Sequence, residues 1–195
     1  MTRLGLGLAA ALCGAGLLAG CTGTPGVSSS GDQGYVSGDG SFKVVKVADR
    51  KTPSAVEGPS LTTGRRLSLA ALRGKIVVVN VWGSWCTECQ VEAAGLSAAA
   101  RELKPRGVAF LGITSRDHEQ ASPRAYQRKF KVPYESIFDP DGTTLLAFHD
   151  SLPPKSTPST LIIDRQGRVA AVVLGPVTKR TLTGLVQDVS RGRST

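Results

Sequence analysis

The chain has 195 residues, which is enough for one domain of ordinary size and too few for two such domains. Its 41% of hydrophobic and 20% of charged residues are typical of a globular protein and exclude a disordered or fibrous chain. The net charge of +9 at pH 7 suits an anionic membrane surface or an acidic partner, but the basic residues are scattered and no nucleic-acid motif accompanies them, so we expect no nucleic-acid partner.

Residues 1–20 have the pattern of an export signal. Arg3 supplies one positive charge, an uncharged run of Leu, Ala and Gly follows, and the small residues Ala19 and Gly20 precede Cys21. This ending is typical of a lipoprotein cleavage site and makes Cys21 the lipidated first residue of the mature protein. An uncleaved membrane helix is the alternative, but the run is short and glycine-rich for a span. We therefore predict a protein anchored by lipid at the extracytoplasmic face of the cell membrane.

The segment after the signal is rich in Gly and Ser. Residues 21–42 show no apolar period and are predicted to form a flexible tether. The folded domain is predicted to cover residues 43–192.

The apolar pattern of this domain predicts alternating strands and helices. A small N-terminal hairpin is expected within residues 52–69, with Thr63 and Gly64 as its turn. Strands are expected at 76–81, 108–113, 160–163 and 168–174. Helices are expected at 87–104, from Ser122 as N-cap, at 143–148 and at 178–189. This order predicts an α/β fold whose mixed central sheet carries helices on both faces.

The folded part contains two cysteines, Cys86 and Cys89. A pair this close in sequence closes a loop too small to stabilise the fold, which favours redox chemistry or metal binding. The strand before the pair and the helix after it place Cys86 at a helix N-terminus, where free N–H groups and the helix dipole stabilise a thiolate. We therefore expect Cys86 to attack a substrate disulfide and Cys89 to resolve the mixed disulfide.

Two metal-binding alternatives use the same cysteines. A zinc site needs further ligands, and the chain offers only the isolated His118 and His149. A copper carrier would need a wider cysteine spacing and a suitably placed histidine. We expect no metal and no cofactor other than the redox-active disulfide, with the copper carrier kept as the alternative that is not an enzyme.

The segment from Val79 to Cys89, Val-Asn-Val-Trp-Gly-Ser-Trp-Cys-Thr-Glu-Cys, resembles the active-site strand and turn of thioredoxins. The longer pattern Cys86-x-x-Cys89-x-x-Glu92 resembles the TlpA/ResA family of membrane-anchored thiol–disulfide oxidoreductases, and the resemblance covers about residues 50–190. It implies a thioredoxin-like fold and an enzyme of cytochrome c maturation. Such an enzyme reduces the Cys-x-x-Cys-His disulfide of apocytochrome c and takes electrons from a thiol protein of the membrane. An oxidase of exported proteins remains the alternative enzyme.

Four further residues complete the predicted site. Glu92 lies on the same face of the predicted helix as Cys89, in a stripe of apolar residues. This predicts a buried carboxyl group whose raised pKa lets it exchange protons near neutral pH. The alternative is a Glu at the edge of this stripe whose carboxyl group reaches water. The resemblance implies a cis bond before Pro158 and a substrate-binding surface made of Trp85, Thr157 and Pro158. The backbone of Thr157 would then pair with an extended substrate.

Overall fold

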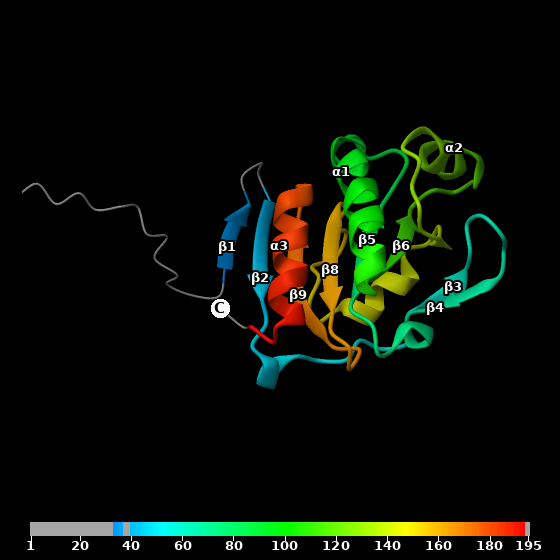
Figure 1. Ribbon diagram of the computed structural model, residues 1–195. Coiled ribbons are helices and arrows are strands. Elements are labelled where there is room, and N and C mark those ends of the chain that lie inside the picture. The colour runs from blue at the N-terminus through cyan, green and yellow to red at the C-terminus, as the bar shows by residue number, and fades with distance from the viewer. Residues whose placement is uncertain (1–32, 37–39, 194–195) are drawn as a thin grey trace, which may run out of the picture.

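The computed structural model describes residues 33–36 and 40–193. Its main sheet has the strand order β1-β2-β9-β8-β5-β6-β7 (Figure 1). The strands of this sheet are β1 (Gln33–Val36), β2 (Gly40–Val44), β5 (Val77–Trp82), β6 (Ala109–Ser115), β7 (Ser136–Asp139), β8 (Ser159–Ile163) and β9 (Val169–Leu174). The pairs β5–β6 and β6–β7 are parallel and the other pairs are antiparallel, so the sheet is mixed as predicted.

The strand β5 lies in the interior of the sheet and is buried over its whole length. Its β-branched valines suit a pleated strand that is covered on both faces. Val77 and Val79 point into one apolar cluster, while Val78 points into another on the opposite face. This packing fixes the register of β5 in the sheet. The C-terminal end of β5 therefore has a fixed position at one edge of the sheet.

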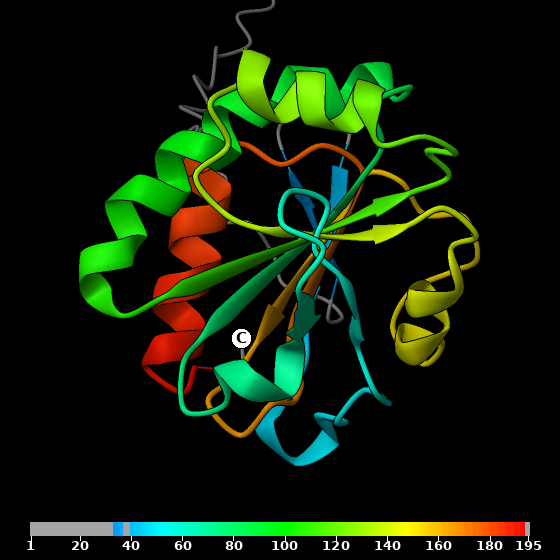
Figure 2. The same cartoon turned by 90° about the vertical axis from the view of Figure 1, so that its right-hand side faces the viewer.

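The helices cover both faces of the sheet. The longer ones are α1 (Thr87–Leu103), α2 (Ala121–Lys129) and α3 (Lys179–Ser190). Helices α1 and α3 pack on one face, and α2 lies across the end where α1 begins (Figures 1 and 2). The 3-10 helix η4 (Thr143–Phe148) covers the other face (Figure 2). Shorter 3-10 turns are η1 (Val47–Asp49), η2 (Leu69–Leu72) and η3 (Lys104–Arg106).

The N-terminal hairpin is present as β3 (Glu57–Pro59) and β4 (Arg66–Ser68). One local prediction is wrong, and one strand was missed. Helix α2 begins at Ala121 with Gln120 as N-cap, so Ser122 lies inside the helix and does not cap it. The sequence pattern did not indicate strand β7. Only the turn after it has a clear signal, and that signal does not indicate pairing with β6.

The predicted tether also needs correction. Residues 21–42 were expected to be flexible, but Gln33–Val36 and Gly40–Val44 form β1 and β2, and β2 pairs with the edge of β9. Phe42 packs against the main apolar cluster, a contact that the Gly- and Ser-rich composition hid. The export signal at 1–20 and Cys21 lie outside the described residues. Among the described helices, none is both long and apolar enough to cross a bilayer.

Candidate active site

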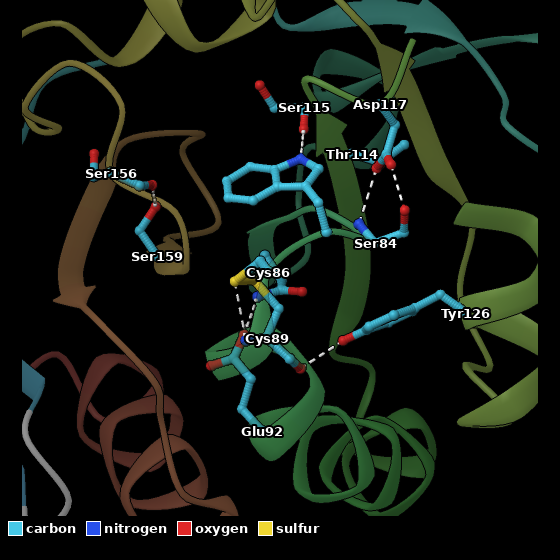
Figure 3. Close-up of a disulfide and its surroundings, with 12 residues drawn as sticks. Ser84, Cys86, Cys89, Glu92, Thr114, Ser115, Asp117, Tyr126, Ser156 and Ser159 are labelled. Carbon is cyan, nitrogen blue, oxygen red and sulfur yellow. Dashed lines mark hydrogen bonds between the residues drawn. A yellow bond between two sulfur atoms is a disulfide. The ribbon is translucent and has the colours of Figure 1, made fainter. Parts of the chain in front are cut away.

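The two cysteines lie where β5 passes into α1. Cys86 is the N-cap of α1, and its Sγ accepts a hydrogen bond from the backbone N–H of Cys89 at 3.1 Å. The two residues form a disulfide (Figure 3). Cys86 is 5% exposed, whereas Cys89 is fully buried. Cys86 is thus the sulfur nearer to solvent, and it accepts a backbone hydrogen bond that would also stabilise a thiolate.

Trp85 lies immediately before Cys86 in the chain. Its side chain is 46% exposed to solvent, which is unusual for a large aromatic residue. Its indole Nε1 donates to the carbonyl of Ser115 at 3.0 Å, and the guanidinium of Arg116 lies 4.2 Å from the ring centroid. These two contacts hold the ring in one orientation, so Trp85 is a preorganised surface beside the reactive sulfur.

Glu92 is buried one helical turn beyond Cys89. Its Oε1 accepts from Asn80 Nδ2 at 3.0 Å and its Oε2 accepts from the backbone N–H of Val177 at 3.0 Å. Side chains on a helix lean toward its N-terminus, and in Figure 3 that of Glu92 extends toward the disulfide. Burial raises its pKa to about 7, against the lowering effect of the two hydrogen bonds, and the charge of Glu88 adds to the rise. The carboxyl group therefore changes protonation near neutral pH, as the helical stripe predicts.

The loop before β8 supplies the other side of the site. The Thr157–Pro158 bond is cis, as the resemblance implies. Because Ser159 pairs with Val81 near the end of β5, this loop lies at the same edge of the sheet as the cysteines. The N–H of Thr157 already donates to the carbonyl of Lys155 at 3.0 Å. Pairing with a substrate through Thr157 would therefore have to use its carbonyl oxygen.

The sequence reasoning missed two residues that hold the site together. Tyr126 of α2 donates its hydroxyl hydrogen to the carbonyl of Cys89 and stacks on Trp82, with ring centroids 4.4 Å apart. Asn80 holds the carboxyl group of Glu92. Asn80 could have been suspected as the one polar residue in an apolar strand, whereas nothing in the sequence connects Tyr126 with Cys89.

Within 33–36 and 40–193, no three His, Cys, Asp or Glu side chains come close enough together to hold a metal ion.

The chemistry available to this arrangement is disulfide exchange. In the reduced protein, a Cys86 thiolate would attack a substrate sulfur, displace the other sulfur as a thiolate and form a mixed disulfide. Cys89 would then lose its proton and attack Cys86, which would release the substrate as a dithiol and leave the Cys86–Cys89 disulfide. Glu92, with a pKa of about 7, is suited to accept the proton from Cys89.

A sheet of this topology, with a Cys-x-x-Cys disulfide at a helix N-terminus and a cis-proline loop at the same edge, defines a thioredoxin-like thiol–disulfide oxidoreductase. The chain belongs to the AhpC/TSA family, whose model matches residues 48–172.

Curated relatives carry names of the same class. Thiol-disulfide oxidoreductase ResA of Bacillus cereus is 25% identical over 127 residues, which cover 65% of this chain and 70% of the relative. Thiol:disulfide interchange protein DsbE of Pseudomonas aeruginosa is 37% identical over 117 residues, which cover 60% of each protein. The match thus spans less than two thirds of the DsbE protein. These relatives confirm the ResA-type resemblance.

Solved structures confirm the thioredoxin-like fold. A secreted thiol-disulfide isomerase from Corynebacterium glutamicum superposes with a TM-score of 0.73 at 28% identity, over 77% of this chain and 92% of that one. A DsbF homologue from Corynebacterium diphtheriae superposes with a TM-score of 0.71 at 29% identity, over 80% and 98% of the two chains.

The first prediction assigns the two cysteines their roles. A Cys89→Ser variant should accumulate a mixed disulfide through Cys86 when it is mixed with a peptide disulfide, because no second thiol can release the peptide. Mass spectrometry of the trapped complex measures the adduct. The matched Cys86→Ser variant should trap little, since its remaining thiol is buried. Equal trapping by both variants would show that the assignment is wrong.

The second prediction concerns Glu92. A Glu92→Gln variant keeps the shape of the side chain but cannot accept a proton, so disulfide exchange should slow by between about ten- and a hundredfold near neutral pH. Its pH–rate profile should also lose the inflection near pH 7 that the wild-type carboxyl group gives. Glu102→Gln, which removes an exposed carboxylate near the other end of the same helix, is the control. A wild-type profile in Glu92→Gln would contradict the role.

Denaturant unfolding of the oxidised protein gives a second readout for Glu92. Its pKa is higher in the folded state, about 7, than the ordinary 4.5, so the folded state binds the proton more tightly. The stability that this provides is fully present below pH 4.5 and is lost as the pH rises through 7. The wild type should lose about 3 kcal/mol over this range, a loss that should be missing from Glu92→Gln.

Proposed function

We propose that this protein reduces disulfides of exported proteins from a lipid anchor on the membrane, and that its client is the Cys-x-x-Cys-His segment of apocytochrome c. The observation that carries the proposal is the buried carboxyl group of Glu92 behind the cysteine pair. A strong disulfide oxidant stabilises the thiolate of its reduced form. Negative charge from Glu92 and from Glu88 in the first turn of α1 acts against a thiolate and therefore favours a reductant.

The compartment explains why such a reductant is needed. Neighbouring thiols outside the cytosol tend to become oxidised. Haem attachment requires both client cysteines as thiols, so a local reductant has to supply two electrons for each client disulfide. The Cys86–Cys89 disulfide that remains must then be reduced by a thiol protein of the membrane. A lipid anchor at Cys21 would keep the domain close to that electron donor.

The shape of the site suits an extended client. Trp85 offers an exposed ring beside Cys86, and the loop with the cis bond at Pro158 lies at the same edge of the sheet. A client segment lying along this loop could pair with the carbonyl oxygen of Thr157 and present its sulfur to Cys86. The names of the relatives, ResA and DsbE, support thiol–disulfide exchange as the activity.

The client prediction is tested by deletion of the gene. The deletion strain should lose haem-stained c-type cytochromes, and the loss should be reversed by the wild type but not by Cys86→Ser. An added small-molecule thiol should partly restore the cytochromes, because it reduces the client directly. Normal cytochromes together with missing disulfides in exported proteins would favour the oxidase instead. Stoichiometric copper binding without disulfide turnover would favour the carrier.

The anchor prediction uses a single substitution. Cys21→Ser removes the thiol that would carry the lipid, so the protein should leave the membrane fraction or remain as an uncleaved precursor. Fractionation with mass spectrometry of the N-terminus measures both. Cys13→Ser, which changes a cysteine inside the predicted signal, should have no effect. A wild-type protein that is free of lipid and absent from membranes would contradict the anchor.

A further inference from the structure

The loop that leads to Cys86 is held by a buried carboxylate that the mechanism above does not use. Asp117, in the loop after β6, is 5% exposed and accepts three hydrogen bonds (Figure 3). Its Oδ2 accepts from the backbone N–H of Ser84 at 3.0 Å and from Thr114 Oγ1 at 2.7 Å, and its Oδ1 accepts from Ser84 Oγ. Both carboxylate oxygens are therefore engaged by the residue that lies two positions before the attacking cysteine.

Within the part of the chain that the structure describes, this carboxylate has no cationic partner. Among residues 33–36 and 40–193, no ion pair includes Asp117, and its three donors are all neutral. The nearest basic residue in sequence, Arg116, places its guanidinium over the ring of Trp85 instead. Hydrogen bonds replace part of the hydration that burial removes, but they do not cancel the charge.

We propose that Asp117 is a positioning residue for Cys86 that also makes the cysteine pair more reducing. Its hydrogen bonds to Ser84 fix the turn in which the N–H of Cys86 donates to the carbonyl of Gly83 at 3.2 Å. Its charge is held against that turn by the two hydrogen bonds from Ser84, two residues before Cys86, and disfavours the Cys86 thiolate. Because the thiolate exists only in the reduced protein, this repulsion destabilises the reduced form and lowers the reduction potential.

Two other acidic groups act on the same pair, and Asp117 differs from both. Glu88 is exposed in the first turn of α1, where water screens its charge. Glu92 lies behind Cys89, and its pKa of about 7 makes its charge depend on pH. Asp117 is buried in the loop after β6, and it holds the loop before Cys86 through the backbone N–H of Ser84.

The test is the reduction potential of an Asp117→Asn variant of the full-length protein, measured by equilibration with glutathione. Asparagine has the same shape: its carbonyl can accept from Ser84 N–H and Thr114, and its amide can donate to the hydroxyl of Ser84, which rotates to accept. The charge is lost while the contacts remain. The equilibrium should shift about tenfold toward the dithiol, a rise of about 30 mV, and Cys86 should be alkylated faster at a fixed pH.

Two variants separate the charge from the contacts. Ser84→Ala and Thr114→Val each remove one hydroxyl donor and keep the charge, so in each the potential should fall slightly, by less than about twofold in equilibrium constant. These two variants carry the test if Asp117→Asn does not fold. An unchanged or lower potential in Asp117→Asn, a rise in Ser84→Ala, or a rise in Thr114→Val would each overturn the proposal.

The experiment also distinguishes this inference from the proposed function, on whose thiol–disulfide exchange it rests. The potential of the wild type tests whether the protein is a reductant. The difference between wild type and Asp117→Asn tests Asp117 alone, whatever the direction of electron flow and whichever protein is the client.

Discussion

Burial of β5 on both faces is the constraint on which the rest of the site depends. A slip of β5 by one residue would turn Asn80 and Trp82 toward the apolar cluster that now holds Val77, Val79 and Val81, so the register of the strand is fixed. The end of β5 at Trp82 is thereby fixed, and α1 must begin a few residues later. The N-terminal turn of α1 brings Cys86 and Cys89 within bonding distance at the edge of the sheet. The reactivity of the pair thus follows from the packing of a strand that contains no reactive group.

The buried carboxyl groups of Glu92 and Asp117 lower the stability of the folded state. Burying the carboxyl group of Glu92 is unfavourable, and the two hydrogen bonds from Asn80 and Val177 compensate only in part, as its raised pKa shows. Asp117 is also buried, and it accepts a hydrogen bond from Ser84, two residues before Cys86. An apolar residue at either position would avoid burying a charge. Both carboxyl groups contact or belong to the segment that carries the cysteines. Their burial lowers the stability of the fold but places them where they can influence the ionisation of the thiols.

Much of the fold could be predicted from local pattern. The apolar run of β5, the helix after it and the hairpin at Gly64 each depend on residues adjacent in the chain. The helical stripe that places Glu92 with Cys89 is also local. Pairing at the sheet edges could not be predicted: β2 joins β9, more than a hundred residues later, and β7 joins β6 without a distinct signal of its own. Strand pairing is decided by contacts that no short window of sequence contains.

By itself, the sequence determined the cysteine pair, its place before a helix and the class of chemistry, because Cys-x-x-Cys on a strand-to-helix junction is a local motif. Only the tertiary structure decided which groups surround the sulfurs. The N–H of Val177 reaches Glu92 from a loop 85 residues away, Tyr126 holds the carbonyl of Cys89 from α2, and Asp117 holds Ser84 across 33 residues. The electrostatic environment of a thiol depends on distance in space, and folding brings together charges and donors whose positions along the chain are unrelated.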